Sequence, residues 1–350
     1  MMKKILLLIT VFSVLLISCE KEDLSTLSDS FYVRHSGADM PVHIYGNATE
    51  KIFIILLHGG PGNNALDFRT SESAEKLEEH YAVVYWQQRG QGSSEGKFNT
   101  EDVTIDMMAE DLQAVIQVLK YKYGENCSFF LLGHSWGGEL GTAFLIKNDY
   151  QNQISGWIEV DGAHDIPKIN TEAVKMFIAV GNEQINLNNS KDKWQKIVEY
   201  AEQIDTTNID IQTGRDLNSK AHSVEKYLLH DNIIQKPNGK TMRKLGIMYH
   251  EDFLTGIISV TYTYINNEIF YNEIETTSFT DKLHQITIPC LFLWGKYDFI
   301  VPSQLGVDAY NLVNTDEKEL VIFDRSGHFP MENQADEFVA AVSGFIEKHK

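Results

Sequence analysis

The chain has 350 residues, of which 43% are hydrophobic and 23% are charged, with 30 Lys and Arg against 49 Asp and Glu. This length gives one large domain or two modest ones, with ample apolar material for a core. The net charge of −19 argues against a nucleic-acid-binding protein, because affinity for phosphate comes from clustered Lys and Arg. The 18 Phe and 15 Tyr residues argue against disorder, because they bury enough surface to offset chain entropy.

The first residues have the pattern of an export signal. Two lysines precede an apolar run over residues 5–17, which is too short to span a bilayer but suits the h-region of a signal peptide. The run ends in Leu-Ile-Ser-Cys, which resembles a bacterial lipobox, so we expect residues 1–18 to be removed and Cys19 to be lipidated. We then expect residues 19–30 to form a tether and the protein to be an exported, membrane-anchored lipoprotein of the outer membrane, facing the periplasm or the surface. An ordinary secretory signal and an uncleaved anchor are the alternatives.

The rest of the chain alternates between strand and helix patterns. Residues 31–46 alternate around a Ser-Gly turn and predict an antiparallel hairpin. Further apolar runs predict strands over residues 51–57, 82–86, 128–132, 154–160, 289–294 and 319–323, with helical patterns between them. Near-continuous apolar strands that alternate with helices indicate a mostly parallel, doubly wound α/β sheet that is covered on both faces.

One long segment interrupts this alternation. Residues 163–284 are polar, mostly helical in period, and contain no clear buried strand. We therefore predict a helical cap over 163–284, inserted into a core that is made of residues 31–162 and 285–350.

A nucleophile motif lies between a strand and a helix. The sequence Gly-His-Ser-Trp-Gly-Gly at residues 133–138 follows the 128–132 strand and begins a helix, which is the context of a G-x-S-x-G nucleophile elbow. Glycines are required there because strand and helix approach closely around a strained serine. We predict that Ser135 is the nucleophile, whereas the alternative is an ordinary small-residue turn.

A serine nucleophile needs a base, and the base needs an orienting acid. Asp298 and His328 each follow a predicted strand near the end of the chain, so both lie at the carboxyl edge of the sheet, where doubly wound folds bind ligands. The other histidines that we considered lie in the inserted segment or directly beside Ser135. Asp161 is the rival for the acid, and we favour Asp298. No metal or other cofactor is expected, because no group of His, Cys and carboxylate residues has ligand spacing.

A glycine-rich turn ends the first parallel strand. The sequence His-Gly-Gly-Pro-Gly at residues 58–62 offers a backbone N–H of Gly59 or Gly60 to an oxyanion, and Trp136 offers a second N–H. A phosphate-binding turn is the alternative, but the Lys and Ser or Thr of a P-loop are absent.

Together, the motifs at 58–62, Gln-Arg-Gly-Gln-Gly-Ser-Ser at 88–94, 133–138, Asp298 and His328 resemble the α/β-hydrolase superfamily. Within it they resemble serine peptidases of the proline iminopeptidase group. The resemblance implies an α/β-hydrolase fold and an aminopeptidase that releases N-terminal residues from short peptides. A carboxylesterase or lipase that acts on small esters with the same triad is the alternative, and a non-catalytic binding protein is a more distant third.

The chain departs from that group at two positions. Gln87 stands where the group usually has Asp, and Glu139 stands four residues after the nucleophile, where a small or apolar residue is commoner. Glu139 is either a carboxylate favoured in the first turn of a helix or a group near the site. Arg89, in the Gln-Arg-Gly turn, is expected to pair with a loop carboxylate rather than to contact substrate.

The resemblance also implies that acidic groups of the cap hold the amino terminus of the substrate. No cluster is evident, and each candidate is expected to lie on a solvated helix face. The candidates are Glu172, Glu183, Glu199, Glu202 and Glu225.

Cys127 and Cys290 each begin a predicted strand. In the resembled fold one strand separates theirs, which places them about 9–10 Å apart and beyond the reach of a disulfide. We expect two buried free thiols.

Overall fold

The computed structural model describes residues 23–237 and 267–350. Within these ranges a nine-stranded sheet has the order β1-β2-β4-β3-β6-β7-β8-β9, with β5 beside β2. The strands are β1 (Leu27–His35), β2 (Ala38–Gly46), β3 (Ile52–Leu57), β4 (Ala82–Trp86), β5 (Glu95–Gly96), β6 (Ser128–His134), β7 (Gly156–Val160), β8 (Cys290–Gly295) and β9 (Lys318–Phe323). The pairs from β4 through β9 are parallel, whereas β1, β2 and β5 pair antiparallel, so the predicted mostly parallel sheet is confirmed.

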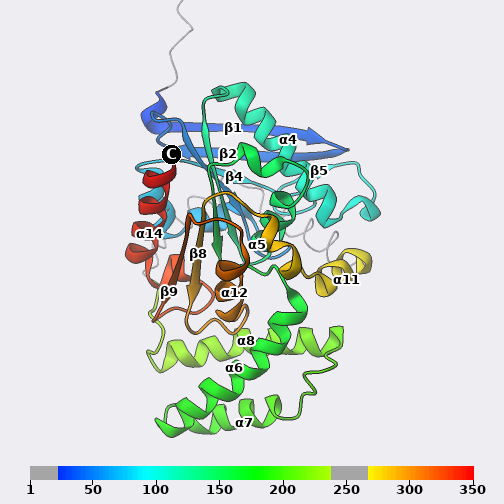
Figure 1. The fold of residues 1–350 in the computed structure, drawn as a ribbon, viewed down its shortest axis with the longest axis vertical. Helices are drawn as coiled ribbons and strands as arrows, with labels where there is room; N and C mark the ends of the chain where they lie inside the picture. The colour runs from blue at the N-terminus through cyan, green and yellow to red at the C-terminus, as the bar shows by residue number, and fades with distance from the viewer. Residues whose placement is uncertain (1–22, 238–266) are drawn as a thin grey trace, which may run out of the picture.

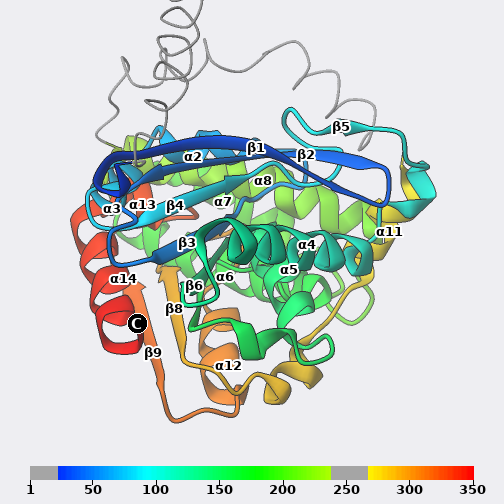
Figure 2. The ribbon, with the colours of Figure 1, turned by 90° about the horizontal axis from the view of Figure 1, so that it is seen from above.

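Helices cover both faces of this sheet (Figure 2). They are α2 (Ala65–Arg69), α3 (Glu72–Glu78), α4 (Ile105–Tyr123), α5 (Trp136–Leu145), α6 (Ile166–Asn186), α7 (Lys191–Ala201), α8 (Ile211–His230), α11 (Glu268–Thr276), α12 (Gln304–Leu312), α13 (Pro330–Asn333) and α14 (Ala335–His349). Strand β3 shows why its sequence is continuously apolar. Phe53, Ile55 and Leu57 face the core that includes α4, α5 and α12, while Ile52, Ile54 and Leu56 face α3 and α14. A strand buried on both faces needs apolar residues at every position.

The helices α6, α7, α8 and α11 follow β7 and precede β8, where the sequence predicted an inserted cap. Figure 1 shows α6, α7 and α8 as a layer at one end of the molecule. An aromatic contact joins this layer to the core. The ring of Phe299, in the loop after β8, lies 5.3 Å from Phe177 of α6 and 5.9 Å from Trp194 of α7. These three rings fix the cap beside Asp298, because Phe299 is its neighbour in sequence.

The predicted tether is too long at its C-terminal end. Residues 27–30 belong to β1, so the predicted hairpin is confirmed but begins before residue 31. Leu27 is buried, and the Asp29 carboxylate accepts a hydrogen bond from the Tyr123 hydroxyl and pairs with Lys122. These contacts with α4 fix residues 27–30, although their polar sequence is typical of a linker.

The predicted signal peptide and the predicted lipidation site Cys19 lie outside the described residues. Over residues 23–237 and 267–350, no helix combines the length and apolar character needed to cross a bilayer.

Cys127 directly precedes β6, and Cys290 is the first residue of β8. Strand β7 lies between these two strands, as expected, and both cysteines are free thiols. Cys290 is buried, but Cys127 is only half-buried, so the prediction of two buried thiols is wrong for Cys127. It precedes the first residue of β6, at the rim of the sheet where the polar loop residue Asn126 is exposed.

Candidate active site

Ser135 stands at the junction of β6 and α5 with φ 56° and ψ −119°, a strained conformation for a residue with a side chain. The flanking glycines make this turn possible. A Cβ on Gly133 would lie 2.4 Å from the carbonyl oxygen of Gly137, and a Cβ on Gly137 would lie 1.9 Å from that of Leu57. The Ser135 N–H donates to the carbonyl oxygen of Val160 at 3.0 Å. The predicted nucleophile is therefore held at a turn that the surrounding strands and glycines define.

His328 and Asp298 meet as predicted. The ring nitrogen Nδ1 of His328 lies 2.8 Å from Oδ2 of Asp298, and both side chains are buried. The other carboxyl oxygen of Asp298, Oδ1, accepts hydrogen bonds from the N–H groups of Ile300 at 2.8 Å and Val301 at 2.9 Å. Burial raises the pKa of Asp298 to about 7, and these donors oppose that effect by stabilising its anion. Because Nδ1 is engaged, Nε2 is the ring nitrogen left to face Ser135, and His328 and Ser135 line the same cavity.

Asp161, the rival for the acid, lies next to this pair. Ligand-type atoms of Asp161, His134 and His328 are all within 4.8 Å of one another. Its Oδ1 accepts a hydrogen bond from the Gly295 N–H at 2.9 Å rather than from the imidazole. Burial and the charge of Asp298 raise the pKa of Asp161 well above its usual range. Asp161 therefore carries a proton beside the Asp298 carboxylate, and the contact with Nδ1 of His328 belongs to Asp298.

His134, which precedes the predicted nucleophile, contacts the main chain of the predicted base His328. Nε2 of His134 lies 2.9 Å from the carbonyl oxygen of His328, so this nitrogen carries the proton and donates. Burial lowers the pKa of His134 to about 3, which keeps its ring neutral. Burial also lowers the pKa of His328, so the resting imidazole is in the form that accepts a proton. The residue that adjoins Ser135 in sequence therefore fixes the main chain of His328.

The predicted oxyanion donors Gly59, Gly60 and Trp136 line the cavity that contains Ser135. Gly59 approaches so closely that a Cβ there would lie 3.3 Å from the Cβ of Ser135. The turn at 88–94 braces these segments through Gln88. Its Oε1 accepts from the Trp136 indole N–H at 2.8 Å, and its Nε2 donates to the carbonyl oxygen of His58 at 3.3 Å. The Gln-Arg-Gly motif thus connects the two chain segments that carry the predicted donors.

The cavity measures about 270 Å³ and lies between the core and the cap. On the cap side its wall includes the apolar side chains of Ile166, Ile169, Ala173, Leu217 and Ile274 and the polar side chains of Asn170, Asn218 and His222. Two carboxylates, Glu139 of α5 and Glu275 of α11, line the same cavity. The space is small, which suits a short substrate.

Glu139 is completely buried, and no hydrogen-bond partner for either carboxyl oxygen is found among the described residues. The nearby Thr277 hydroxyl donates to the carbonyl oxygen of Glu273 at 2.7 Å. Its proximity tends to lower the pKa of Glu139, against the larger effect of burial. Burial, together with the charges of Glu273 and Glu275, raises the pKa of Glu139 well above its usual range. Of the two roles considered for this residue, the structure supports a group at the site rather than a solvated first-turn carboxylate. An unpaired buried carboxyl is costly, so it points to a ligand group that completes it.

The five cap glutamates do not line the cavity. Glu183, Glu199 and Glu202 are exposed, as expected for solvated helix faces, and Glu172 is half-buried beside Lys175. The expectation is wrong for Glu225, which is buried and accepts a hydrogen bond from the His328 N–H at 2.9 Å. A signal was present in the sequence, since Glu225 follows the buried residues Leu217, Ala221 and Val224 at helical spacing. Glu275 carried no comparable signal.

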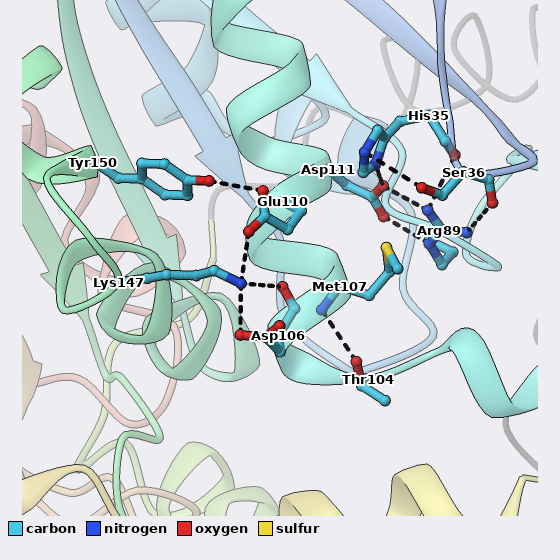
Figure 3. A network of polar contacts seen from close by, with 10 residues as sticks. All are labelled: His35, Ser36, Arg89, Thr104, Asp106, Met107, Glu110, Asp111, Lys147 and Tyr150. Atoms are coloured by element: carbon cyan, nitrogen blue, oxygen red, sulfur yellow. Dashed lines mark hydrogen bonds and ion pairs between the residues drawn. The ribbon is translucent and has the colours of Figure 1, made fainter.

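Arg89 has a structural role (Figure 3). Its guanidinium donates to both carboxyl oxygens of Asp111, at 2.7 and 2.6 Å, and to the carbonyl oxygens of His35 and Ser36, each at 3.1 Å. Arg89 therefore pairs with a carboxylate, as expected, but that carboxylate belongs to helix α4 and not to a loop. The departure at Gln87 is also structural, since its Oε1 accepts from the Ala65 N–H at the start of α2 at 3.1 Å.

Comparisons with known proteins agree with this geometry. Residues 49–220 match the family described as serine aminopeptidase, S33. The proline iminopeptidase of Saccharolobus solfataricus is 26% identical over 319 residues, which cover 91% of this chain and 92% of that protein. Among solved structures, the proline iminopeptidase of Mycobacterium smegmatis has a TM-score of 0.61 at 16% identity and covers 92% of this chain and 98% of its own. An esterase from Exiguobacterium antarcticum has a TM-score of 0.59 at 18% identity, with 91% and 99% covered. At these identities the solved structures establish the fold alone.

Proposed function

The chain is a serine hydrolase of the α/β-hydrolase superfamily, and we propose that it is an aminopeptidase of the proline iminopeptidase type that releases N-terminal residues from short peptides. The observation that carries the proposal is the carboxyl group of Glu139, buried in the cavity wall without a hydrogen-bond partner among the described residues. The similarity to curated proline iminopeptidases over nine-tenths of the chain supports the same activity.

An aminopeptidase substrate brings a charged ammonium group into the cavity, and an ester does not. Glu139 lies in the first turn of α5, the helix that begins directly after Ser135, and both residues line the same cavity. This arrangement suits the short distance between the scissile carbonyl and the α-amino group of a first residue. A bound ammonium supplies the positive charge and the N–H donors that Glu139 lacks, and it restores the ionised form. Glu275, which is half-buried at 3.7 Å from Arg215, adds negative charge to the same wall.

The chemistry then follows from the positions of three side chains. Nε2 of His328 takes the proton of Ser135 Oγ as that oxygen attacks the first peptide carbonyl. The Asp298 carboxylate at Nδ1 stabilises the imidazolium that forms, and the N–H groups of Gly59 or Gly60 and of Trp136 hold the oxyanion. The imidazolium then protonates the leaving amine, and water hydrolyses the acyl-enzyme by the same route.

The test compares amides with esters. Purified protein is assayed with proline- and alanine-naphthylamides and with short p-nitrophenyl esters, before and after Glu139→Gln. We expect kcat/KM for the amides to fall by about 10–100-fold, the value of a hydrogen bond to a charged group, and ester turnover to change much less. The exposed cap residue Glu183, changed to Gln, is the matched control. Ester turnover with no amide turnover in the unaltered protein would establish the esterase alternative instead.

We also propose that the protein is an exported lipoprotein anchored through Cys19. The support is the sequence alone, namely the short apolar run over residues 5–17 and the lipobox-like ending. Cys19→Ser is expected to move the protein from the membrane fraction to the soluble fraction. An unchanged distribution would contradict lipidation at this position.

A further inference from the structure

We propose that Glu225, on cap helix α8, is a positioning residue for the histidine base, so that the cap completes the catalytic geometry as well as enclosing the substrate. This inference goes beyond the proposed peptidase activity, because it concerns His328 and applies to an ester as much as to a peptide. Glu225 does not line the cavity, so it acts through the main chain of His328.

The peptide groups of His328 are held from two directions. Oε1 of Glu225 accepts from the N–H at 2.9 Å, and His134 donates to the carbonyl oxygen at 2.9 Å. The first contact comes from the cap and the second from the nucleophile elbow. Asp298 contacts Nδ1 of the ring, so the N–H, the carbonyl oxygen and Nδ1 of His328 each have a hydrogen-bond partner, and Nε2 is left for Ser135. Removing Glu225 releases one end of this arrangement while Ser135 stays fixed by the core.

The loop before His328 is shaped to receive the cap. A Cβ on Gly327 would lie 2.8 Å from Cδ of Glu225, so only glycine leaves room for the carboxyl group. Ten residues after Glu225, the N–H of Gln235 donates to the carbonyl oxygen of Arg325 at 2.8 Å. The carbonyl oxygen of Gln235 accepts from Asn333 Nδ2 at 2.7 Å. The chain that leaves α8 thus binds the same loop at further points.

The charges around Glu225 make its protonation part of this arrangement. The titratable groups around it are Asp298 and Asp161 of the core and His328, whereas His222, one turn earlier on α8, interacts with His328 and Asp298. Burial, and next the charge of Asp298, raise the pKa of Glu225 to about 8. Near neutral pH the carboxyl is therefore mostly uncharged, and it accepts from the His328 N–H without repelling Asp298. Above about pH 8 its ionisation places two carboxylates side by side in a buried site, which weakens the seating of α8 on the loop.

The experiment uses Glu225→Ala and Glu225→Gln in the full chain, with the exposed cap residue Glu199, changed to Gln, as control. The readouts are kcat and KM on a short p-nitrophenyl ester and the labelling rate of Ser135 by a fluorophosphonate. Neither probe carries an ammonium group, so failure of the peptidase proposal leaves this test intact. We expect Glu225→Ala to lower kcat and the labelling rate by about 10–100-fold, with little change in KM, because a small displacement of the base is sufficient.

Glu225→Gln keeps an acceptor for the His328 N–H and removes the ionisation. We expect it to recover most of the activity lost in Glu225→Ala, within about threefold of the unaltered protein at pH 7. We also expect it to lose the decline in kcat that the unaltered protein shows above about pH 8. If Glu225→Ala is folded and as active as the unaltered protein, the proposal is wrong. It is equally wrong if Glu225→Gln has the same kcat-against-pH profile as the unaltered protein, and this second measurement applies even if Glu225→Ala does not fold.

Discussion

Replacing Asp298 with Asn separates the two acids between which the sequence offered a choice, and the structure sets the size of the effect. Oδ1 of Asp298 accepts from the N–H groups of Ile300 and Val301, so in Asp298→Asn the side-chain oxygen stays there and the NH₂ group faces His328 Nδ1. The imidazole must then accept at Nδ1 and carry its proton on Nε2. A ring in that tautomer cannot take the proton of Ser135.

We expect kcat to fall by about 10⁴-fold, or roughly 5.5 kcal/mol of transition-state stabilisation. The matched variant is Asp161→Asn, where Gly295 still has its acceptor and the imidazole contact is untouched. Its expected loss is below about tenfold, because only the neighbouring protonated carboxyl changes. The assay is steady-state ester or naphthylamide hydrolysis, with fluorophosphonate labelling of Ser135 and thermal unfolding as checks on the site and the fold. A larger loss in Asp161→Asn than in Asp298→Asn, in folded proteins, would refute the assignment of Asp298.

Three further predictions concern stability. Gly137→Ala places a Cβ 1.9 Å from the Leu57 carbonyl oxygen, so we expect it to lower the free energy of unfolding by about 3 kcal/mol or more, measured in urea. Arg89→Lys keeps the charge but loses the two-point contact with Asp111, and we expect a loss of about 2 kcal/mol in the same assay with active-site labelling retained in the folded fraction. Glu139 has a folded-state pKa above its unfolded value of 4.5, so its contribution to stability is complete below that value and is lost as pH rises towards the folded pKa. Thermal unfolding from about pH 4.5 to pH 8 should therefore show a smaller fall in Tm for Glu139→Gln than for the unaltered protein, and equal falls would contradict the buried, uncharged carboxyl.

Local pattern was enough to predict the succession of strands and helices along the chain and a mostly parallel sheet. The apolar runs could be recognised because a parallel strand buried on both faces must be apolar at each position, as in Ile52–Leu57. Ser135 could be placed because its turn tolerates only glycine at the close contacts, which leaves a mark in the sequence. The partners Asp298 and His328 followed from their positions after strands, and the structure brings them to 2.8 Å.

The sequence could not show which carboxylates lie in the site or where polar linker becomes strand. Glu139 and Glu225 are buried because segments distant in the chain enclose them, and Glu275 is half-buried. Glu199 and Glu202 carry the same side chain but lie on an exposed surface. Likewise, the burial of Leu27 and its inclusion in β1 depend on pairing with β2 and on contacts with α4.

The amino-acid sequence by itself determined the succession of strands and helices, the nucleophile turn and the residue types of the triad, because these depend on local periodicity and on backbone conformations that only glycine permits. The tertiary structure decided which acid faces His328, that Glu139 is buried in the cavity wall, and that the cap reaches the base through Glu225. Each of these properties depends on desolvation and on hydrogen-bond partners that come from elements far apart in the chain. Helical spacing indicated the burial of Glu225, but no local pattern indicated its partner.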